Sequence, residues 1–212
     1  MILYIYGDYM YKNIIFDLDG TLWDSRKQVI DAWKCVFPNI NISSVDELND
    51  LMGKTTEDFM NFLFPSFDKD TALDNMTQLE KAEVAYLNVN GANIYTNTIN
   101  TIKNLSKHHK LFIVSNCQTG YIESFLNYYN LKNNFIDIEC NGNTNLSKSK
   151  NINLIITRNN LDTNETCYVG DTLSDLNASL DNDIKFIWAK YGFGNNLDCE
   201  ISIDDISELN NF

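Results

Sequence analysis

Two aspartates stand one residue apart, directly after a short apolar segment near the N-terminus. Residues 13–16 read Asn-Ile-Ile-Phe, and Asp17 and Asp19 follow at once. Carboxylates held this close repel each other, so a fold keeps them together where a cation lies between them or where one must carry a proton to act. Gly20 allows a sharp turn with its backbone close to a ligand, and Thr21 adds a hydroxyl donor for a substrate.

A second acidic segment, near the other end of the chain, repeats this plan. Residues 169–175 read Val-Gly-Asp-Thr-Leu-Ser-Asp. We expect Asp171 to ligate a metal ion, and Asp175 to lie within reach of that metal or of a lysine. Oxygen ligands of this kind favour a hard divalent cation, magnesium first. Together with Asp17 and Asp19, these residues predict a metal-dependent site for phosphate transfer.

Polar side chains that suit a phosphate group occur between the two acidic segments. Ser115 and Asn116 end an apolar run, and their hydroxyl and amide groups can hold phosphate oxygens. Lys148, or Lys150 as the alternative, lies in a predicted polar loop before a helical segment that starts near Asn151. A lysine there can offset the charge of carboxylate and phosphate together.

Short apolar runs alternate with amphipathic helical patterns, which predicts an α/β fold with a doubly wound, mainly parallel, Rossmann-like sheet. The expected strands cover residues 12–17, 110–115, 135–138, 166–170 and 184–188. In such sheets, ligands bind in the crevice beyond the carboxyl ends of the strands. The acidic and polar residues described above all follow expected strands or lie in loops, so we expect them to meet at that edge.

The long segment 25–93 contains no convincing strand, and we interpret it as a helical cap inserted after the first strand. Residues 1–24 and 94–212 would then form a discontinuous core, with the cap placed over the site as a lid. Thr55 and Asp58 have the spacing of a capping box, which predicts a helix start. A longer helix should follow, with one apolar face made of Leu73, Met76, Leu79, Ala82 and Tyr86.

These motifs together resemble those of the haloacid dehalogenase superfamily, in its phosphatase branch with a helical cap. The overall plan is similar to that of phosphoglycolate phosphatases and β-phosphoglucomutases. The motifs occur in the family's order and span nearly the whole chain. The matching residues are, motif by motif, Asp17, Asp19, Gly20 and Thr21, then Ser115, then Lys148, and last Gly170 and Asp171 with Asp175.

The resemblance implies a role for each residue of the site. Asp17 would attack phosphorus and form an aspartyl-phosphate, while Asp19 would protonate the leaving alcohol and then deprotonate the attacking water. Magnesium would be held by the Asp17 carboxylate, the main-chain carbonyl of Asp19 and Asp171. Ser115 and Lys148 would steady the phosphoryl group as it is transferred.

The segment 51–55 resembles the cap loop that touches the substrate near its leaving group in related enzymes. Gly53 would then allow a close approach, and Lys54 would contact a second anionic group. The alternative is purely structural, with Gly53 ending one helix and Thr55 capping the next. Mutase relatives carry an arginine shortly after the glycine where this chain has Thr56, which weakens a mutase interpretation.

The sequence therefore predicts a magnesium-dependent phosphatase acting on a small phosphorylated metabolite. A phosphomutase that uses the same aspartyl-phosphate is the first alternative, and a non-enzymatic protein that binds phosphometabolites is the second. Dehalogenation is disfavoured, because a halide leaves without a proton and would not need the acid that Asp19 supplies.

Composition restricts the partners further. The formal net charge of the 212 residues is −13 and no basic face is visible, which argues against a nucleic-acid partner. No run approaches 18 apolar residues, so we expect no membrane span. The oligomeric state is not defined by the sequence, and a monomer is compatible with it.

The five cysteines are scattered, without a Cys-x-x-Cys motif, and their odd number argues against a disulfide framework. Reduced thiols and a cytoplasmic location are therefore expected. The first residues carry an acidic side chain and no basic region, so we do not interpret them as a signal peptide, and Met10 would also serve as a start.

Overall fold

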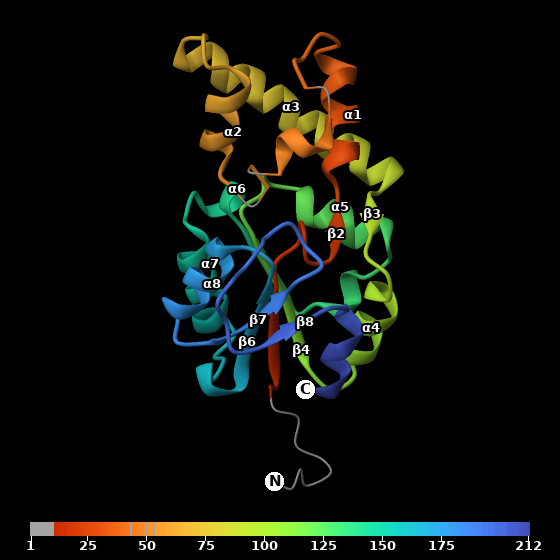
Figure 1. Ribbon diagram of the computed structural model, residues 1–212, viewed down its shortest axis with the longest axis vertical. Helices are drawn as coiled ribbons and strands as arrows, with labels where there is room; N and C mark the ends of the chain where they lie inside the picture. The colour runs from red at the N-terminus through yellow and green to blue at the C-terminus, as the bar shows by residue number, and fades with distance from the viewer. Residues whose placement is uncertain (1–10, 43, 50, 53) are drawn as a thin grey trace, which may run out of the picture.

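The computed structural model describes residues 11–42, 44–49, 51–52 and 54–212, and its centre is a six-stranded parallel sheet (Figure 1). The strands lie side by side in the order β5, β4, β1, β6, β7, β8. In that order their bounds are Asp137–Cys140, Lys110–Ser115, Asn13–Phe16, Thr166–Gly170, Lys185–Ala189 and Ser202–Ile203. The two neighbours of β1 in the sheet, β4 and β6, come from distant parts of the chain, so the position of β1 depends on long-range pairing.

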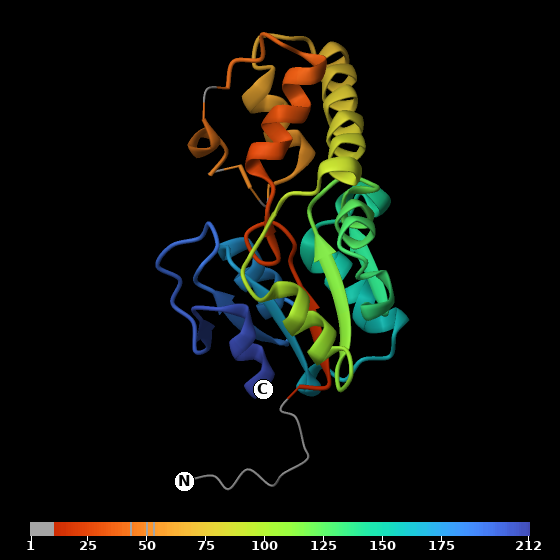
Figure 2. The same ribbon diagram turned by 90° about the vertical axis from the view of Figure 1, so that its right-hand side faces the viewer.

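Helices cover both faces of the sheet, because the strand side chains are apolar on both sides. Ile15 on β1 joins a cluster with helices α7 (Lys148–Arg158) and α8 (Leu173–Leu180). Ile14 joins the cluster of α4 (Thr98–Leu105) and α5 (Tyr121–Tyr128). These two helices lie on the opposite face of the sheet from α7 and α8 (Figures 1 and 2). The shorter helical elements of the core are α6 (Asn141–Thr144) and the 3₁₀ turns Lys132–Asn134, Thr163–Glu165 and Ile206–Asn211.

The strand predictions hold closely, with one error. The strands at 110–115 and 166–170 have the predicted bounds, and those at 12–17 and 184–188 differ by one residue at each end. The strand expected at 135–138 is instead β5, which starts two residues later. Apolarity placed it too early, because the apolar Ile136 is 62% exposed and the strand register with β4 runs from Asp137 to Cys140.

Three helices and a 3₁₀ turn lie beyond the carboxyl end of β1, as Figure 2 shows. They are α1 (Arg26–Val36), the turn Val45–Leu48, α2 (Thr56–Leu63) and α3 (Lys69–Asn90). The segment leaves and re-enters the core through a short antiparallel pair, β2 (Trp23–Asp24) and β3 (Asn93–Ile94). Helix α3 packs against α1 and also against α5 of the core. The predicted domain bounds, 1–24 with 94–212 and 25–93, remain a prediction.

The start of α2 confirms the capping box, since the Thr55 main-chain N–H donates to Asp58 Oδ2 at 3.0 Å. The buried face of α3 was predicted only in part, with Met76 and Leu79 buried as expected and Ala82 and Tyr86 only partly buried. It consists of Ala72, Met76, Leu79, Glu83 and Leu87. Leu73 is 50% exposed, and Glu83 lies on the buried side, to which hydrophobic periodicity cannot assign a charged residue.

The described helices also bear on the expected absence of a membrane span. None of the helices in the described part of the chain combines the length and apolar character that crossing a bilayer requires.

Candidate active site

Three carboxylates from distant parts of the sequence meet at the carboxyl edge of the sheet. Asp17, Asp171 and Asp175 each offer an oxygen, and these atoms lie within 4.8 Å of one another. The convergence follows from strand register, because Phe16 at the end of β1 pairs with Val169 near the end of β6. All three side chains are almost fully buried.

Lys148 is the cation that faces this cluster. Its Nζ lies 3.0 Å from Asp17 Oδ1 and 2.6 Å from Asp175 Oδ1. The prediction that Lys148 lies in a polar loop is wrong, because α7 begins at Lys148 with Ser147 as its N-cap. That helix start fixes the direction of the buried lysine, while Lys150, the alternative, is exposed.

The charges of this group do not balance. Burial raises the pKa of Asp17 to about 6 against the opposing effect of Lys148. Burial, together with Asp175 and Asp17, raises the pKa of Asp171 well above its ordinary value. Asp17 Oδ2 is buried and accepts no hydrogen bond from the described residues. One lysine cannot neutralise three carboxylates, and Asp17 Oδ2 has no hydrogen-bond donor within the described part of the chain. Both features suit a hard divalent cation held by oxygen ligands.

The Asp171 carboxylate is held by main chain and by a hydroxyl. Phe193 N–H donates to Oδ2 at 2.7 Å, and Thr21 Oγ1 lies 3.4 Å from Oδ1. Thr21, predicted as a substrate-binding residue, is therefore directed at the acidic cluster. Gly20 has a φ of +82°, and a Cβ there would lie 2.3 Å from Asp171 Oδ2, so only glycine fits.

Asp175 acts mainly as a positioning group in this geometry. Its Oδ2 accepts hydrogen bonds from Thr172 N–H at 2.9 Å and from Asp171 N–H at 3.2 Å. These bonds form the capping box of α8, while Oδ1 pairs with Lys148. Both oxygens are thus already engaged, which favours the predicted contact to the lysine over direct metal ligation.

The Asp19 carboxylate lies apart from the three-carboxylate cluster found among the described residues. Ser25 Oγ donates to Asp19 Oδ1 at 2.5 Å, and the Tyr121 hydroxyl is 3.1 Å from the same oxygen. Burial raises the pKa of Asp19 to about 7, although these two donors lower it. A carboxyl group that titrates near neutral pH suits a general acid and base.

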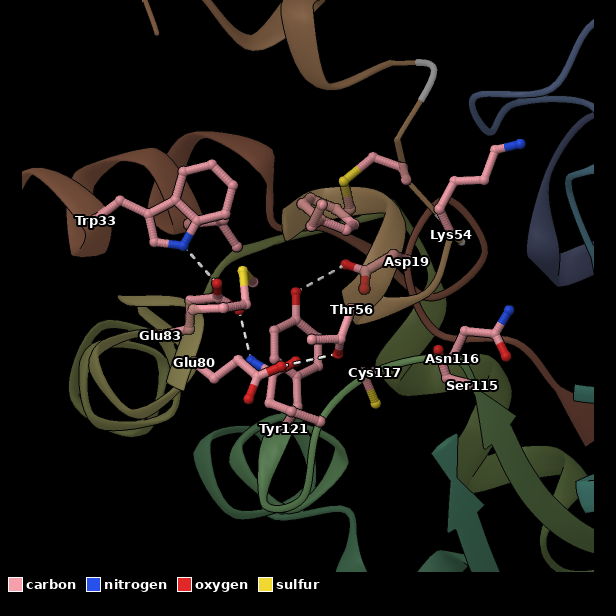
Figure 3. A pocket seen from close by; sticks show the side chains of 15 residues that line it. Asp19, Trp33, Lys54, Thr56, Glu80, Glu83, Ser115, Asn116, Cys117 and Tyr121 are labelled. Carbon is pink, nitrogen blue, oxygen red and sulfur yellow. Dashed lines mark hydrogen bonds between the residues drawn. The ribbon is translucent and has the colours of Figure 1, made fainter. Parts of the chain in front are cut away.

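A cavity opens beside Asp19, between the core and the helices beyond it (Figure 3). Ser115 and Asn116, at the end of β4, line it as predicted, and Lys54 lines it from the other side. Lys54 is exposed, and its side chain extends away from the interior of the cavity (Figure 3). Gly53, the other cap residue predicted to bind substrate, lies outside the described residues.

Several residues of the site were missed from the sequence. Ser25 and Tyr121 hold Asp19, and Glu80 and Glu83 on α3 line the cavity. Ser25 stands six residues after Asp19 at a helix start, a signal that could have been used. Tyr121 is 102 positions from Asp19, and no local sequence pattern connects the two residues. Glu83 was overlooked because charged residues are assigned to the solvated side of a helix.

Comparison with known proteins agrees with this geometry. The protein-family model described as haloacid dehalogenase-like hydrolase matches residues 14–189. The chain therefore belongs to the haloacid dehalogenase-like hydrolase family, and the resemblance expected from its motifs is confirmed.

Solved structures share the fold over almost the whole chain. A haloacid dehalogenase-like hydrolase from Bacteroides fragilis is 22% identical, covers 94% of this chain and 99% of its own, and has a TM-score of 0.81. A predicted phosphoglycolate phosphatase from Haemophilus somnus is 18% identical, with 97% and 99% covered and a TM-score of 0.82. A β-phosphoglucomutase from Clostridium difficile is 15% identical, with 94% and 93% covered and a TM-score of 0.74.

Replacing Glu83 by glutamine should change how stability depends on pH. Burial raises the pKa of Glu83 from 4.5 to about 8 in the folded protein. Its contribution to stability is therefore complete below pH 4.5 and is lost as the pH rises through 8. Between pH 5 and pH 8, the free energy of unfolding of Glu83→Gln should gain on that of the wild type by on the order of 2–4 kcal/mol.

Urea unfolding at the two pH values measures this difference. Glu57→Gln, the same replacement at an exposed position on α2, is the control and should show no pH-dependent gain. An equal difference between Glu83→Gln and wild type at both pH values would contradict the raised pKa.

Proposed function

We propose that this protein is a magnesium-dependent phosphatase that hydrolyses a small phosphate monoester through an aspartyl-phosphate. The observation that carries the proposal is the presence of a buried nucleophile candidate, Asp17, two residues before a separate acid, Asp19, which lines the cavity. Membership of the hydrolase family and the phosphatase among its structural neighbours support it.

The reaction would run in two steps. A carboxylate oxygen of Asp17 attacks phosphorus, the bond from phosphorus to the alcohol oxygen breaks, and Asp19 gives its proton to the leaving alkoxide. Asp19, now ionised, takes a proton from a water molecule that attacks the aspartyl-phosphate. Inorganic phosphate leaves, and Asp17 regains its carboxylate. Ser115 and Asn116 would hold phosphate oxygens at the cavity edge, and Lys148 would offset negative charge on Asp17.

The acidic cluster is where we propose that magnesium binds. Asp17 and Asp171 would be its side-chain ligands, with the main-chain carbonyl of Asp19 beside them, and Asp175 would hold Lys148. When bound, the ion would balance the carboxylates and withdraw charge from the phosphoryl oxygens. The unbalanced charge and the unpartnered Asp17 Oδ2 support this assignment.

We also propose that residues 25–93 act as a cap over a core formed by 1–24 and 94–212. The cavity has walls from both parts, so the helical segment would exclude water from the reacting groups. Such segments commonly close over substrate and open for product release.

A phosphomutase is the second candidate, because a β-phosphoglucomutase shares the fold. Thr56, which donates to Glu80 at 2.8 Å, stands where the mutase relatives carry an arginine. We therefore favour hydrolysis, and release of inorganic phosphate in the assays below would distinguish it from isomer formation.

Replacing the proposed nucleophile should abolish turnover. Asp17→Asn keeps the shape of the side chain but removes its negative charge, so it cannot form the aspartyl-phosphate. Hydrolysis of p-nitrophenyl phosphate in magnesium should fall by at least about a thousandfold. Asp181→Asn, at an exposed position after α8, is the matched control and should keep wild-type activity. Wild-type turnover by Asp17→Asn would refute the proposed function.

Removing divalent cations should silence the enzyme. Three buried carboxylates repel each other and the incoming phosphate unless a cation offsets them. Dialysis against EDTA should therefore remove p-nitrophenyl phosphatase activity, and added magnesium should restore it. Asp171→Asn should raise the magnesium concentration needed for half-maximal activity by about tenfold or more. Undiminished activity after dialysis would exclude the metal role.

The acid should matter most for poor leaving groups. Asp19→Ala removes the proton donor, and an alkoxide needs that proton far more than p-nitrophenolate does. Turnover of an alkyl phosphate should fall by at least about a hundredfold more than turnover of p-nitrophenyl phosphate. Steady-state kinetics on the two esters measures this ratio, and equal losses on both would contradict the assignment of Asp19.

A further inference from the structure

The cavity beside Asp19 has a second chemically distinct end, formed by α1 and α3. Its volume is about 50 Å³, room for the few heavy atoms of a small alcohol. Asp19 and Ser115 lie at the reaction end, and Trp33, Glu80 and Glu83 lie at the far end, as Figure 3 shows. Whatever alcohol is esterified to the phosphate must extend toward this far end, so its walls select the substrate.

Glu83 is buried there without a cation. It is 5% exposed, and its two oxygens accept hydrogen bonds from Trp33 Nε1 and from Gln118 Nε2, the latter at 2.5 Å. Both donors are neutral, and no basic side chain in the described part of the chain forms an ion pair with Glu83. With no cation beside it among the residues described, the buried group is held largely in its protonated form, and an incoming positive charge would favour its ionisation.

Glu80 lies one helical turn before Glu83 and adds to the same wall. Thr56 Oγ1 donates to its Oε1 at 2.8 Å, while Oε2 accepts no hydrogen bond from the described residues. Burial raises the pKa of both glutamates, that of Glu83 to about 8. A cation placed between them would favour their ionised forms, whereas an anion would disfavour their ionisation and gain no attraction.

Aromatic side chains shield this end of the cavity from water. Trp33 and Phe59 pack edge to face, with ring centroids 6.1 Å apart, and both line the cavity. The Trp33 N–H donates to Glu83, so the indole ring turns its edge toward the glutamate. Lys54 is the basic residue among those that line the cavity, and it is exposed and directed away from the glutamates (Figure 3).

We propose that Glu83, assisted by Glu80, selects phosphate monoesters whose alcohol carries a protonated amine. This inference rests on the proposed function and names the substrate class of the same site. The ammonium group would sit between the two glutamates while the phosphate faces Asp17 and Asp19. A second carboxylate or phosphate on the substrate would meet the acidic wall, and a neutral alcohol would gain nothing from it.

Esters of similar size and different charge test this selection. The probes are O-phosphoethanolamine and 3-aminopropyl phosphate, 2-hydroxyethyl phosphate as the neutral ester, and phosphoglycolate as the anionic ester. The wild type should show a kcat/KM for the better amine ester at least about tenfold above both other classes. Equal values for all three classes, or a preference for phosphoglycolate, would overturn the proposal.

Single substitutions test whether Glu83 and Glu80 cause the preference for amine esters. Glu83→Gln should lower the ratio of kcat/KM between amine and anionic esters by about tenfold or more, and Glu80→Gln should lower it as well. Glu57→Gln, exposed on α2, should keep the wild-type ratio. An unchanged ratio in Glu83→Gln would overturn the role of this residue, and its urea unfolding curve establishes that the variant is folded.

Binding separates this inference from the proposed function. Isothermal titration calorimetry on Asp17→Asn in magnesium measures affinity for the same four esters without turnover. If wild-type protein does not hydrolyse p-nitrophenyl phosphate but Asp17→Asn still prefers the amine esters, the phosphatase proposal fails and the selectivity stands. If hydrolysis is normal but neither turnover nor binding favours the amine, the selectivity proposal fails alone.

Discussion

Mutual repulsion among buried carboxylates is the constraint on which the rest of this structure depends. Asp17, Asp171 and Asp175 converge within a few ångströms, and one lysine offsets only part of their charge. In a low-dielectric interior this arrangement costs free energy. The fold supports it through strand register, two helix N-termini and the main-chain donor of Phe193. The residual charge suits a divalent ion and a transferring phosphoryl group.

The same logic applies at the other end of the cavity. Glu80 and Glu83 are held by neutral donors, and the chain as a whole carries a formal charge of −13. A general field of this sign attracts cations and opposes anions, so a phosphate must be bound by local positive features. An ester that carries an ammonium group has a smaller net negative charge, so the negative field of the protein would repel it less. The two ends of the cavity would then act on opposite ends of one zwitterionic substrate.

Much of the site could be predicted from local patterns. Asp17, Asp171 and Ser115 each stand at a strand end, where apolar runs change to polar residues, while Lys148 was found as one of two lysines in a polar segment. Glu83 could not be predicted in this way, because periodicity places charge on the solvated side of a helix. Tyr121 could not either, since its bond to Asp19 joins residues that share no local pattern. The error at β5 has the same origin, because apolarity reports burial while main-chain pairing defines a strand.

The sequence alone determined the α/β class, the family and the residue types that carry the chemistry, because these depend on short-range order along the chain. Tertiary structure decided which of two lysines reaches Asp17, that Thr21 turns to Asp171, and that a glutamate of α3 lines the cavity. These outcomes depend on the distance and direction between side chains from separate elements. Such distances are set only when the sheet and its helices pack together, and no spacing in the sequence encodes them.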